Sequence, residues 1–434
     1  MERRLIGALA LAAALLISAV AASAGSSAPD RQAATKLVVW LQNDAESGWK
    51  DVVAATNNTF RSRHSDVEVD VQYQTWGDHL TKFDAAIAGG NAPDVIEFGN
   101  TETTRYMASR LLQDLTTMKR TFPNSSTWLK ALTDSCTYNG RLYCVPYYAG
   151  ARAVIYRKDQ YRAAGVRSTP KSLAQFQAAG LKLMRRYGKQ RNYSALYFPG
   201  RYVWGSMSFV YDYGGQIAVR KGGKWQGTLH SPQAIRGLTK LKQIVTSLSR
   251  ANKTGDEANP QQALVFSKGR VGSFIGNGWE WPYALDAKVG NPSLASKIGA
   301  YPMPSHVKGK FMPTFLGGSD LAVPVTSRNK SLAYDWIRIF TGNTSMRQLA
   351  VTGGVIPNST SLTSINAKNP KLAPFAAASK SSWFVPTAPN WVKVENARVL
   401  QTMLGSIFTG RSSVAKAAKR ASDQITRILN QPTT

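Results

Sequence analysis

The only two cysteines of this chain, Cys136 and Cys144, lie eight positions apart and could form a covalent crosslink. Between them stands Asn139-Gly140, the strongest short-range signal for a two-residue hairpin turn. Such a hairpin brings Cys136 across from Tyr143 and Cys144, within the range that a disulfide can bridge. We therefore expect a structural disulfide, because nothing around the pair resembles a redox-active Cys-x-x-Cys motif. Two buried free thiols are the alternative.

Side chains suited to catalysis are few and scattered. No arrangement of Ser, His and Asp is suggested, and no P-loop or complete Gly-x-Gly-x-x-Gly fingerprint follows a strand. Glu280 with Asp286 or Glu395 would supply two carboxylates, but nothing in the sequence fixes their spacing. We expect no enzymatic activity, no metal and no cofactor. The four histidines all stand in polar, loop-like contexts: His64, His79, His230 and His306.

The first residues have the pattern of an export signal. Arg3 and Arg4 precede an apolar run from Leu5 to Ala22, and Ala22-Ser23-Ala24 is a small-x-small cleavage motif. We predict a signal peptide over residues 1–24 and a flexible spacer over 25–35. The alternative is an uncleaved membrane anchor, since the apolar run is borderline for spanning a bilayer. We expect an exported, soluble protein in an oxidising compartment, extracellular, at the cell surface or periplasmic.

Composition indicates a folded chain with an unusual charge. Of the 434 residues 43% are hydrophobic, which excludes a largely disordered protein, and the length favours two domains or one bilobal body. The 54 Lys and Arg exceed the 25 Asp and Glu by 29, and loss of Glu2, Arg3 and Arg4 with the signal peptide leaves a net charge of +28. The cations are dispersed, so we expect no nucleic-acid partner. We expect association with anionic envelope polymers or lipid headgroups instead.

Alternating strand and helix patterns organise the amino-terminal part. Helical spacing of apolar residues over 47–63 and 76–88 alternates with three β-rich segments, and this order predicts a parallel sheet with helices on its faces. Ligands of such sheets bind beyond the carboxyl ends of the strands. The strands are expected at Lys36–Gln42, Val67–Tyr73 and Asp94–Phe98, and the loops of interest at Asn43–Gly48, Thr75–Asp78 and Gly99–Thr103. Further helices are expected over Lys158–Gly165, Ser172–Tyr187, Ser231–Arg250, Leu332–Phe340 and Ser412–Leu429, and strands over Ala153–Tyr156 and Asp320–Pro324.

Eight short segments form a pattern that is specific because of their order. They are Gly89–Asn100, Tyr106–Leu115, Asn139–Tyr143, Val145–Gly150, Val154–Asp159, Gly276–Pro282, Phe315–Pro324 and Gly353–Asn358. Together they resemble the extracellular solute-binding proteins of ABC sugar importers, the maltose-binding-protein-like family. The chain departs from Gram-positive members at the cleavage site, where Ala-Ser-Ala-Gly replaces a lipobox cysteine, so we do not expect a lipid tether.

The resemblance implies an α/β fold of two lobes, each a mixed, mostly parallel sheet flanked by helices, with the ligand cleft between them. Lobe 1 would comprise residues 36–147 and 313–350, and lobe 2 residues 148–312 and 351–434. The function implied is capture of a mono- or oligosaccharide by a monomer and its delivery to the membrane permease subunits of an ABC importer. The alternative is a secreted carbohydrate-active hydrolase or an envelope-associated binding protein.

The resemblance also implies a pocket that combines flat aromatic faces for sugar rings with donors and acceptors for hydroxyl groups. Trp279 and Trp281 stand in a Gly-rich turn, and Trp391 precedes Glu395 by one helical turn. Core packing is the alternative for each tryptophan, and helix capping for Asp44, Glu102 and Asp320. The aromatic candidates are Trp76, Tyr148, Tyr202, Trp204, Trp279, Trp281 and Trp391. The polar candidates are Asp44, Asn100, Thr101, Glu102, Arg152, Gly318, Ser319 and Glu395.

Overall fold

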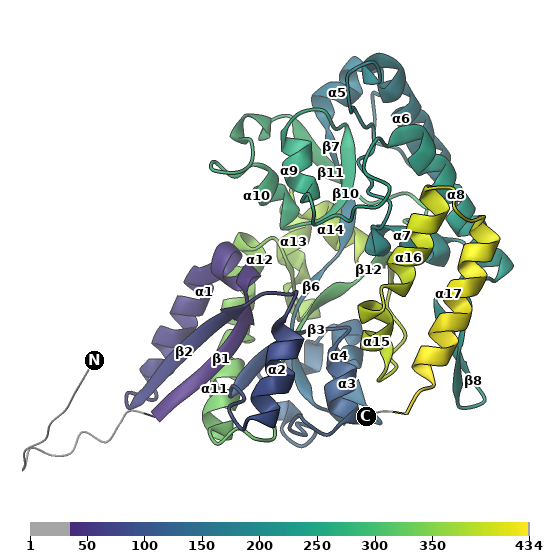
Figure 1. Cartoon of the computed structure of the whole chain (residues 1–434). Coiled ribbons are helices and arrows are strands. Elements are labelled where there is room, and N and C mark those ends of the chain that lie inside the picture. The colour runs from purple at the N-terminus through teal and green to yellow at the C-terminus, as the bar shows by residue number, and fades with distance from the viewer. Residues whose placement is uncertain (1–34, 433–434) are drawn as a thin grey trace, which may run out of the picture.

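The computed structural model describes residues 35–432, so the predicted signal peptide and the spacer up to residue 34 lie outside the described residues. Strands and helices alternate along the chain (Figure 1). The strands are β1 (Thr35–Gln42), β2 (Val67–Gln74), β3 (Val95–Gly99), β4 (Thr137–Tyr138), β5 (Arg141–Leu142), β6 (Cys144–Gly150), β7 (Arg152–Arg157), β8 (Ala218–Lys221), β9 (Lys224–Gly227), β10 (Ser273–Asn277), β11 (Ile298–Tyr301), β12 (Thr314–Phe315), β13 (Gly317–Ala322), β14 (Ile356–Pro357) and β15 (Ser382–Trp383).

Helices surround these strands. The α-helices are α1 (Asn43–Arg61), α2 (His79–Ala88), α3 (Thr103–Ala108), α4 (Lys130–Ser135), α5 (Lys158–Ala163), α6 (Leu173–Tyr187), α7 (Val203–Asp212), α8 (Pro232–Leu248), α9 (Gln262–Ser267), α10 (Glu280–Ala284), α11 (Lys330–Phe340), α12 (Asn343–Thr352), α13 (Thr363–Lys368), α14 (Ala373–Ala378), α15 (Trp391–Asn396), α16 (Val399–Phe408) and α17 (Val414–Leu429). Short 3-10 turns are η1 (Lys119–Thr121), η2 (Ser125–Thr127), η3 (Pro292–Leu294) and η4 (Thr360–Leu362). Within residues 35–432, no helix combines the length and the apolar character that a membrane crossing requires.

A six-stranded sheet in the order β14-β6-β13-β3-β1-β2 forms the centre of lobe 1. Strand β1 pairs parallel with β2 and β3, which confirms the predicted β-α-β-α-β unit, whereas β13 runs antiparallel to β3 and β6. Helix α1 covers the sheet with the apolar face that its spacing predicts, including Trp49, Val53 and Phe60. The sheet is therefore mixed, with its parallel part built from the amino-terminal third of the chain.

Two predicted boundaries are wrong. Helix α1 begins at Asn43 and not at Ser47, so the expected loop Asn43–Gly48 is a helical turn. A kink at Trp49, whose φ and ψ of −153° and 38° are not helical, separates this turn from the rest of α1. Carboxylates are favoured in a first turn because the positive end of the helix dipole lies there, which explains Asp44 and Glu46 in this position. Helix α2 begins at His79 and not at Trp76, so Trp76 lies in the loop before the helix.

A three-stranded sheet, β10-β7-β11, forms the centre of lobe 2. Strand β7 pairs antiparallel with both neighbours, and Tyr197 adds a parallel bridge to Phe274. Helices α6 and α8 begin after Ser172 and Ser231, whose hydroxyls accept hydrogen bonds from the first-turn amides Gln175 and Ala234. Their apolar residues, among them Leu183 and Leu241, pack in the core of this lobe.

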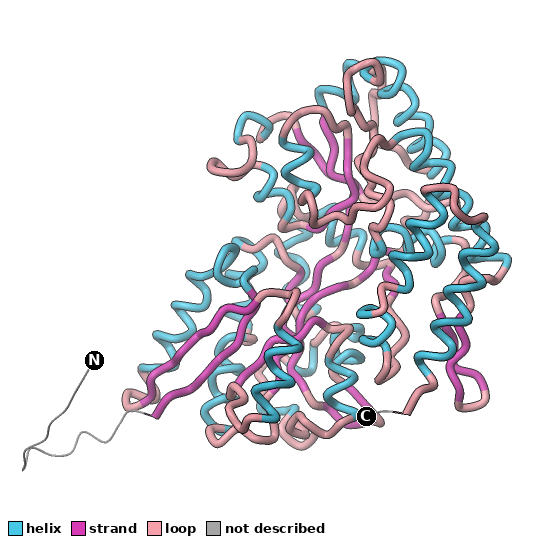
Figure 2. Tube along the Cα trace, in the orientation of Figure 1, coloured by secondary structure: helices cyan, strands magenta, loops and turns pink. Residues whose placement is uncertain are grey.

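Strands β6 and β7 join the two sheets through a single residue, Ala151. Figure 2 shows this strand path passing from the larger sheet to the smaller one almost without interruption. The division of the chain into lobes stays a prediction at residue level. Beyond residue 350, where lobe 2 was expected to resume, β14 pairs with β6, and Val355 and Leu362 pack in the core of the first sheet. Strand β6, which belongs to the first sheet, runs to Gly150. We therefore extend the first segment of the proposed lobe 1 to residue 150 and its second segment to about residue 362.

The cysteine hairpin is confirmed in full. Strands β4 and β5 pair antiparallel around Asn139 and Gly140, which have φ values of +49° and +76°, as the predicted turn requires. The Tyr143 amide donates to the Cys136 carbonyl at 2.9 Å, and Cys136 and Cys144 are joined, with their Cα atoms 4.9 Å apart. The disulfide therefore closes the hairpin where the chain enters strand β6.

Replacing both cysteines by alanine is expected to lower the free energy of unfolding by about 2.5 kcal/mol, because the crosslink limits the unfolded chain over a short loop. Urea unfolding followed by circular dichroism measures this. Treating the unaltered protein with a thiol reductant is the control and should give the same loss. Equal unfolding midpoints with and without reductant would contradict a stabilising role.

Candidate ligand-binding site

An aromatic ring and a carboxylate meet beside the carboxyl end of β1. The Trp76 indole N–H donates to Asp44 Oδ2 at 2.5 Å, and burial raises the pKa of Asp44. The Trp76 side chain nevertheless stays 40% exposed, because only its edge is held. Asp44 therefore orients a tryptophan whose ring remains accessible to a ligand.

Glu102 and His79 form a second polar group beside this ring. Glu102 Oε2 accepts from the Gly99 amide at 2.8 Å and lies 2.9 Å from His79 Nε2. Burial alone lowers the pKa of His79, but the Glu102 carboxylate and the Trp76 carbonyl outweigh it, and the net shift is upward. The expectation that His79 lies in a polar loop is wrong, because the side chain is buried at the start of α2.

Glu97 is a buried acid that was not among the predicted site residues. It lies within β3. Its Oε2 atom accepts a hydrogen bond from the backbone N–H of Gln42 at 2.8 Å, and its Oε1 atom has no partner among the described residues. Burial raises its pKa to about 7. A charged residue inside the apolar run Val95–Phe98 was the available signal, since Glu is almost never fully buried without a partner.

The two lobes touch through a carboxylate. Thr101, after β3, donates to Glu395 Oε2 on α15 at 3.3 Å, and the Trp391 indole N–H donates to Glu395 Oε1 at 2.8 Å. Burial, reinforced by nearby Glu102, raises the pKa of Glu395 to about 8. Trp391 is only 1% exposed, so in this conformation it orients Glu395 and offers no face for stacking.

A second contact between the lobes is aromatic. The ring of Trp279, in the turn after β10, lies 6.3 Å from that of Tyr148 on β6, edge to face. A side chain at Gly150 would place its Cβ 2.3 Å from the Trp279 ring, so only glycine allows this approach. Trp279 is half-buried, and this position at the crossing between the lobes supports its predicted role.

Three candidates form one cluster on the lobe 2 side. Arg152 Nε donates to the Tyr202 hydroxyl at 2.9 Å, and this hydroxyl donates to the Ile275 carbonyl at 2.9 Å. Trp204 stacks on Phe315 with ring centres 4.2 Å apart. Tyr202 is fully buried, whereas Arg152 and Trp204 are half-buried and accessible.

The candidates on β13 and at its edge are packed into the first sheet. Asn100 donates from its amide side chain to the Leu316 carbonyl at 3.1 Å, and its backbone N–H donates to the Gly318 carbonyl at 2.9 Å. Gly318 has a φ of +154° and passes so close to Tyr148 that a Cβ would lie 2.0 Å from its carbonyl oxygen. Ser319 is buried beside them. These residues shape the wall of the junction.

Trp281 stands apart from the other candidates. It is more than nine-tenths buried and packs with the core of the smaller sheet. It also lines a 320 Å³ cavity with Leu285 of lobe 2 and Val351 of α12. Its neighbour Glu280 accepts from the Asn277 amide at 2.7 Å and from Gln262 at 2.9 Å, so this carboxylate has a structural role.

The structure thus brings most candidates to the junction between the lobes. Carboxylates and hydroxyls alternate there with indole and phenol rings, an arrangement that suits a ligand with apolar faces and a rim of hydroxyl groups. The groups brought together are Asp44 with Trp76, Glu102 and Thr101 with Glu395 and Trp391, Tyr148 with Trp279, and Arg152 with Tyr202 and Trp204.

Fold and site together define a two-lobed α/β binding protein whose ligand would lie between the lobes. A family model for bacterial extracellular solute-binding proteins matches residues 55–374, and the chain belongs to this family. The diacetylchitobiose binding protein DasA of Streptomyces coelicolor is 30% identical over 99% of this chain and 100% of its own length. The galactooligosaccharide-binding protein of Bacillus subtilis is 23% identical, covering 96% of each chain.

Solved structures share the fold. The GacH receptor of Streptomyces glaucescens, studied unliganded and with acarbose, superposes with a TM-score of 0.78 at 22% identity, covering 92% of this chain and 99% of the receptor. Maltose-bound MalE3 of T. maritima gives 0.75 at 20% identity, covering 91% of this chain and 100% of MalE3. The predicted fold class is confirmed by these likenesses.

Glu395→Gln is expected to change how stability depends on pH. The folded protein keeps a proton on Glu395 up to about pH 8, whereas the unfolded chain releases it near the ordinary value of 4.5. Raising the pH from about 4.5 to about 8 therefore progressively lowers the free energy of unfolding of the unaltered protein. The amide side chain of the Glu395→Gln variant has no proton to release, so this variant avoids that loss.

Urea unfolding at pH 5, 6.5 and 8 measures the effect. The stability of Glu395→Gln relative to the unaltered protein should rise with pH, and a difference that is flat or falls with pH would contradict a proton held on Glu395. The exposed Glu68→Gln is the matched control for the substitution itself.

Proposed function

We propose that this protein captures a mono- or oligosaccharide between its lobes and delivers it to an ABC-type permease. The observation that carries the proposal is the convergence of aromatic rings and hydrogen-bonding groups from both lobes at one junction. Trp76 and Trp279 would cover the apolar faces of sugar rings, and Asp44, Glu395 and Arg152 would bind hydroxyl groups. Membership in a family of transport binding proteins supports this assignment.

Closure of the lobes would report that the ligand is bound. Thr101 and Glu395 already bridge the lobes, and Gly150 to Arg152 connect them covalently. A ligand that binds both lobes stabilises the closed arrangement in proportion to its extra contacts there, and the permease would recognise that arrangement.

For the ligand, we propose an oligosaccharide that includes an amino sugar. The support is the full-length likeness to a protein named for diacetylchitobiose binding, together with the supply of tryptophans at the junction. We further propose that the protein acts without catalysis, as a monomer, after export and cleavage behind Ala24. The proposed hydrolase carboxylate Glu280 is held by backbone and side-chain donors of its own turn, which supports binding over catalysis.

Trp279→Ala should weaken oligosaccharide binding by at least about 30-fold, because loss of a central aromatic contact costs about 2 kcal/mol or more. Tryptophan fluorescence and thermal shift, screened over mono- and oligosaccharides that include diacetylchitobiose, measure this. The unaltered protein should bind one of them with micromolar or tighter affinity.

Trp225→Ala is the matched control, since Trp225 is equally half-buried but lies on the β8–β9 hairpin. It should keep the affinity of the unaltered protein. A broad panel without any melting shift would argue against sugar binding, and unchanged affinity in Trp279→Ala would remove Trp279 from the site.

A further inference from the structure

The expectation of dispersed cations is wrong, because more than half of the net charge lies in one part of lobe 2. Residues 160–255 contain 17 Lys and Arg but a single acid, Asp212, so these 96 residues carry a net charge of +16 out of +29. Asp212 is buried, and its carboxylate accepts from the backbone and ring nitrogens of His306, both at 2.9 Å. No acidic group of this segment is therefore free to balance its cations.

The outer end of this part is formed by α5, α6 and the loop between them, far from β1 and β2 (Figure 1). The exposed cations of residues 158–191 define a surface that we call the basic end. They are Lys158, Arg162, Arg167, Lys171, Lys182, Arg185, Arg186, Lys189 and Arg191. The one acid in this range, Asp159, accepts two hydrogen bonds from the guanidinium group of Arg157, at 2.8 and 2.6 Å.

Helix stability explains only part of this pattern. Arg185 and Arg186 lie in the last turn of α6, where the helix dipole favours cations. Lys182 and Arg186, however, are four residues apart on one helix face, a like-charge pair that destabilises an isolated helix. Arg167 and Lys171 lie in the loop before the helix, where the dipole offers them no compensation.

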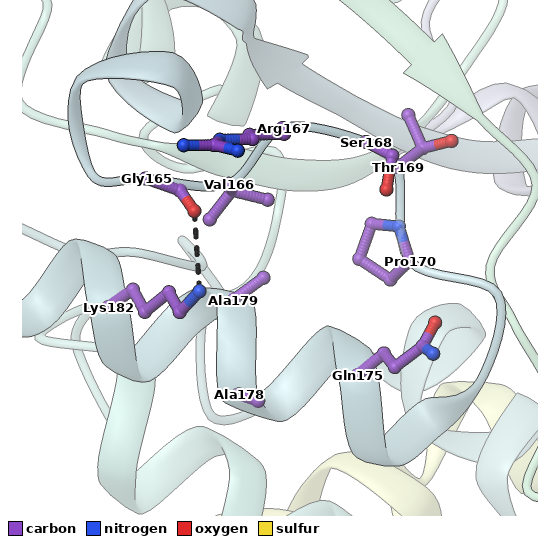
Figure 3. A pocket seen from close by; sticks show the side chains of 10 residues that line it. All are labelled: Gly165, Val166, Arg167, Ser168, Thr169, Pro170, Gln175, Ala178, Ala179 and Lys182. Carbon is purple, nitrogen blue, oxygen red and sulfur yellow. Dashed lines mark hydrogen bonds between the residues drawn. The ribbon is translucent and has the colours of Figure 1, made fainter.

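A polar groove runs through the basic end. It has a volume of about 570 Å³ and lies between the loop Gly165–Pro170 and helix α6. Figure 3 shows Arg167, Ser168 and Thr169 on the loop opposite Gln175 and Lys182 on the helix. The groove therefore offers two cations, two hydroxyls and an amide, and no aromatic ring lines it.

The same surface lacks what a membrane anchor needs. The apolar residues of α6, including Phe176 and Leu183, are buried in the core of lobe 2. Leu181, 37% exposed, is the one large apolar side chain exposed in residues 158–191. Interfacial helices bury a wide apolar face in the bilayer, so this surface is better suited to a dissolved polymer.

We propose that the basic end binds a linear polyanion of the cell envelope whose repeating charged group is a phosphate. Many weak contacts along such a chain add up, because each bound phosphate releases condensed counterions. Binding there holds the protein at the envelope while the lobe junction remains free for its own ligand, so this inference is independent of the proposed transport function.

The test compares two triple variants for binding to long-chain inorganic polyphosphate. Arg167→Gln, Arg185→Gln and Lys189→Gln remove three cations of the basic end, and none of these side chains makes a described hydrogen bond or ion pair. The matched control removes three exposed cations of lobe 1, through Arg63→Gln, Arg120→Gln and Arg347→Gln. Both variants have the same net charge.

The basic-end variant should bind about tenfold more weakly at low salt, and the slope of log affinity against log salt should fall by about two. The control variant should bind nearly as well as the unaltered protein. Equal losses in both variants, or no binding of polyphosphate by the unaltered protein, would overturn the proposal. Tighter binding to phosphatidylglycerol vesicles than to polyphosphate would overturn it in favour of a membrane.

A second measurement needs no variant. Acetylation of the unaltered protein, read by mass spectrometry, should show that polyphosphate protects Lys182 and Lys189 but leaves Lys368 and Lys380 reactive. Orthophosphate at the same total phosphate concentration should protect neither pair. Uniform protection of all four lysines would contradict a localised binding surface.

Discussion

Burial of carboxylates at the lobe junction is the constraint on which the site depends. Glu97 and Asp320 in the first sheet and Glu395 on α15 have pKa values raised to about 7, 7 and 8, in each case mainly by removal from water. Such groups are tolerated only where donors are fixed around them. The backbone N–H of Gln42 donates a hydrogen bond to Glu97. The hydroxyls of Thr103 and Ser135 donate to Asp320. The Trp391 indole and the Thr101 hydroxyl donate to Glu395.

These donors come from elements far apart in the chain, so the carboxylates also connect the architecture. Asp320 on β13 ties α3 to α4, beside the disulfide at the end of α4. Glu395 ties lobe 2 to the loop after β3. Buried acceptors of this kind suit hydroxyl groups, because a ligand hydroxyl can donate to an acceptor that already lies outside bulk water.

Local patterns in the sequence were sufficient to predict several parts of the fold. The apolar period of α1, the alternation in β2 and the Asn139-Gly140 turn each act within a few residues. The start of α1 was missed because Asp44 and Glu46 suit both a loop and a first helical turn. Only its contact with Trp76, 32 residues away, decides what Asp44 does.

The candidate site shows the limit of such patterns more clearly. Trp391 and Trp76 are the same residue type in similar polar surroundings, yet one is buried behind Glu395 and the other keeps an open ring. That difference arises from tertiary packing, since Trp391 belongs to the core that α7, α16 and α17 form in lobe 2. Trp76 lies in a loop, where it contacts Asp44 and His79.

Charged residues are also distributed unevenly over the protein. Helices α5, α6 and α8 contain a single acid, Asp159, whereas the buried acids Glu97 and Glu395 lie close to the junction between the lobes. At physiological ionic strength the Debye length is about 8 Å, so distant exposed charges of the two regions barely influence each other. A neutral sugar at the junction and a polyanion on the outer end can therefore be bound without competition. Each region is free to evolve its own specificity.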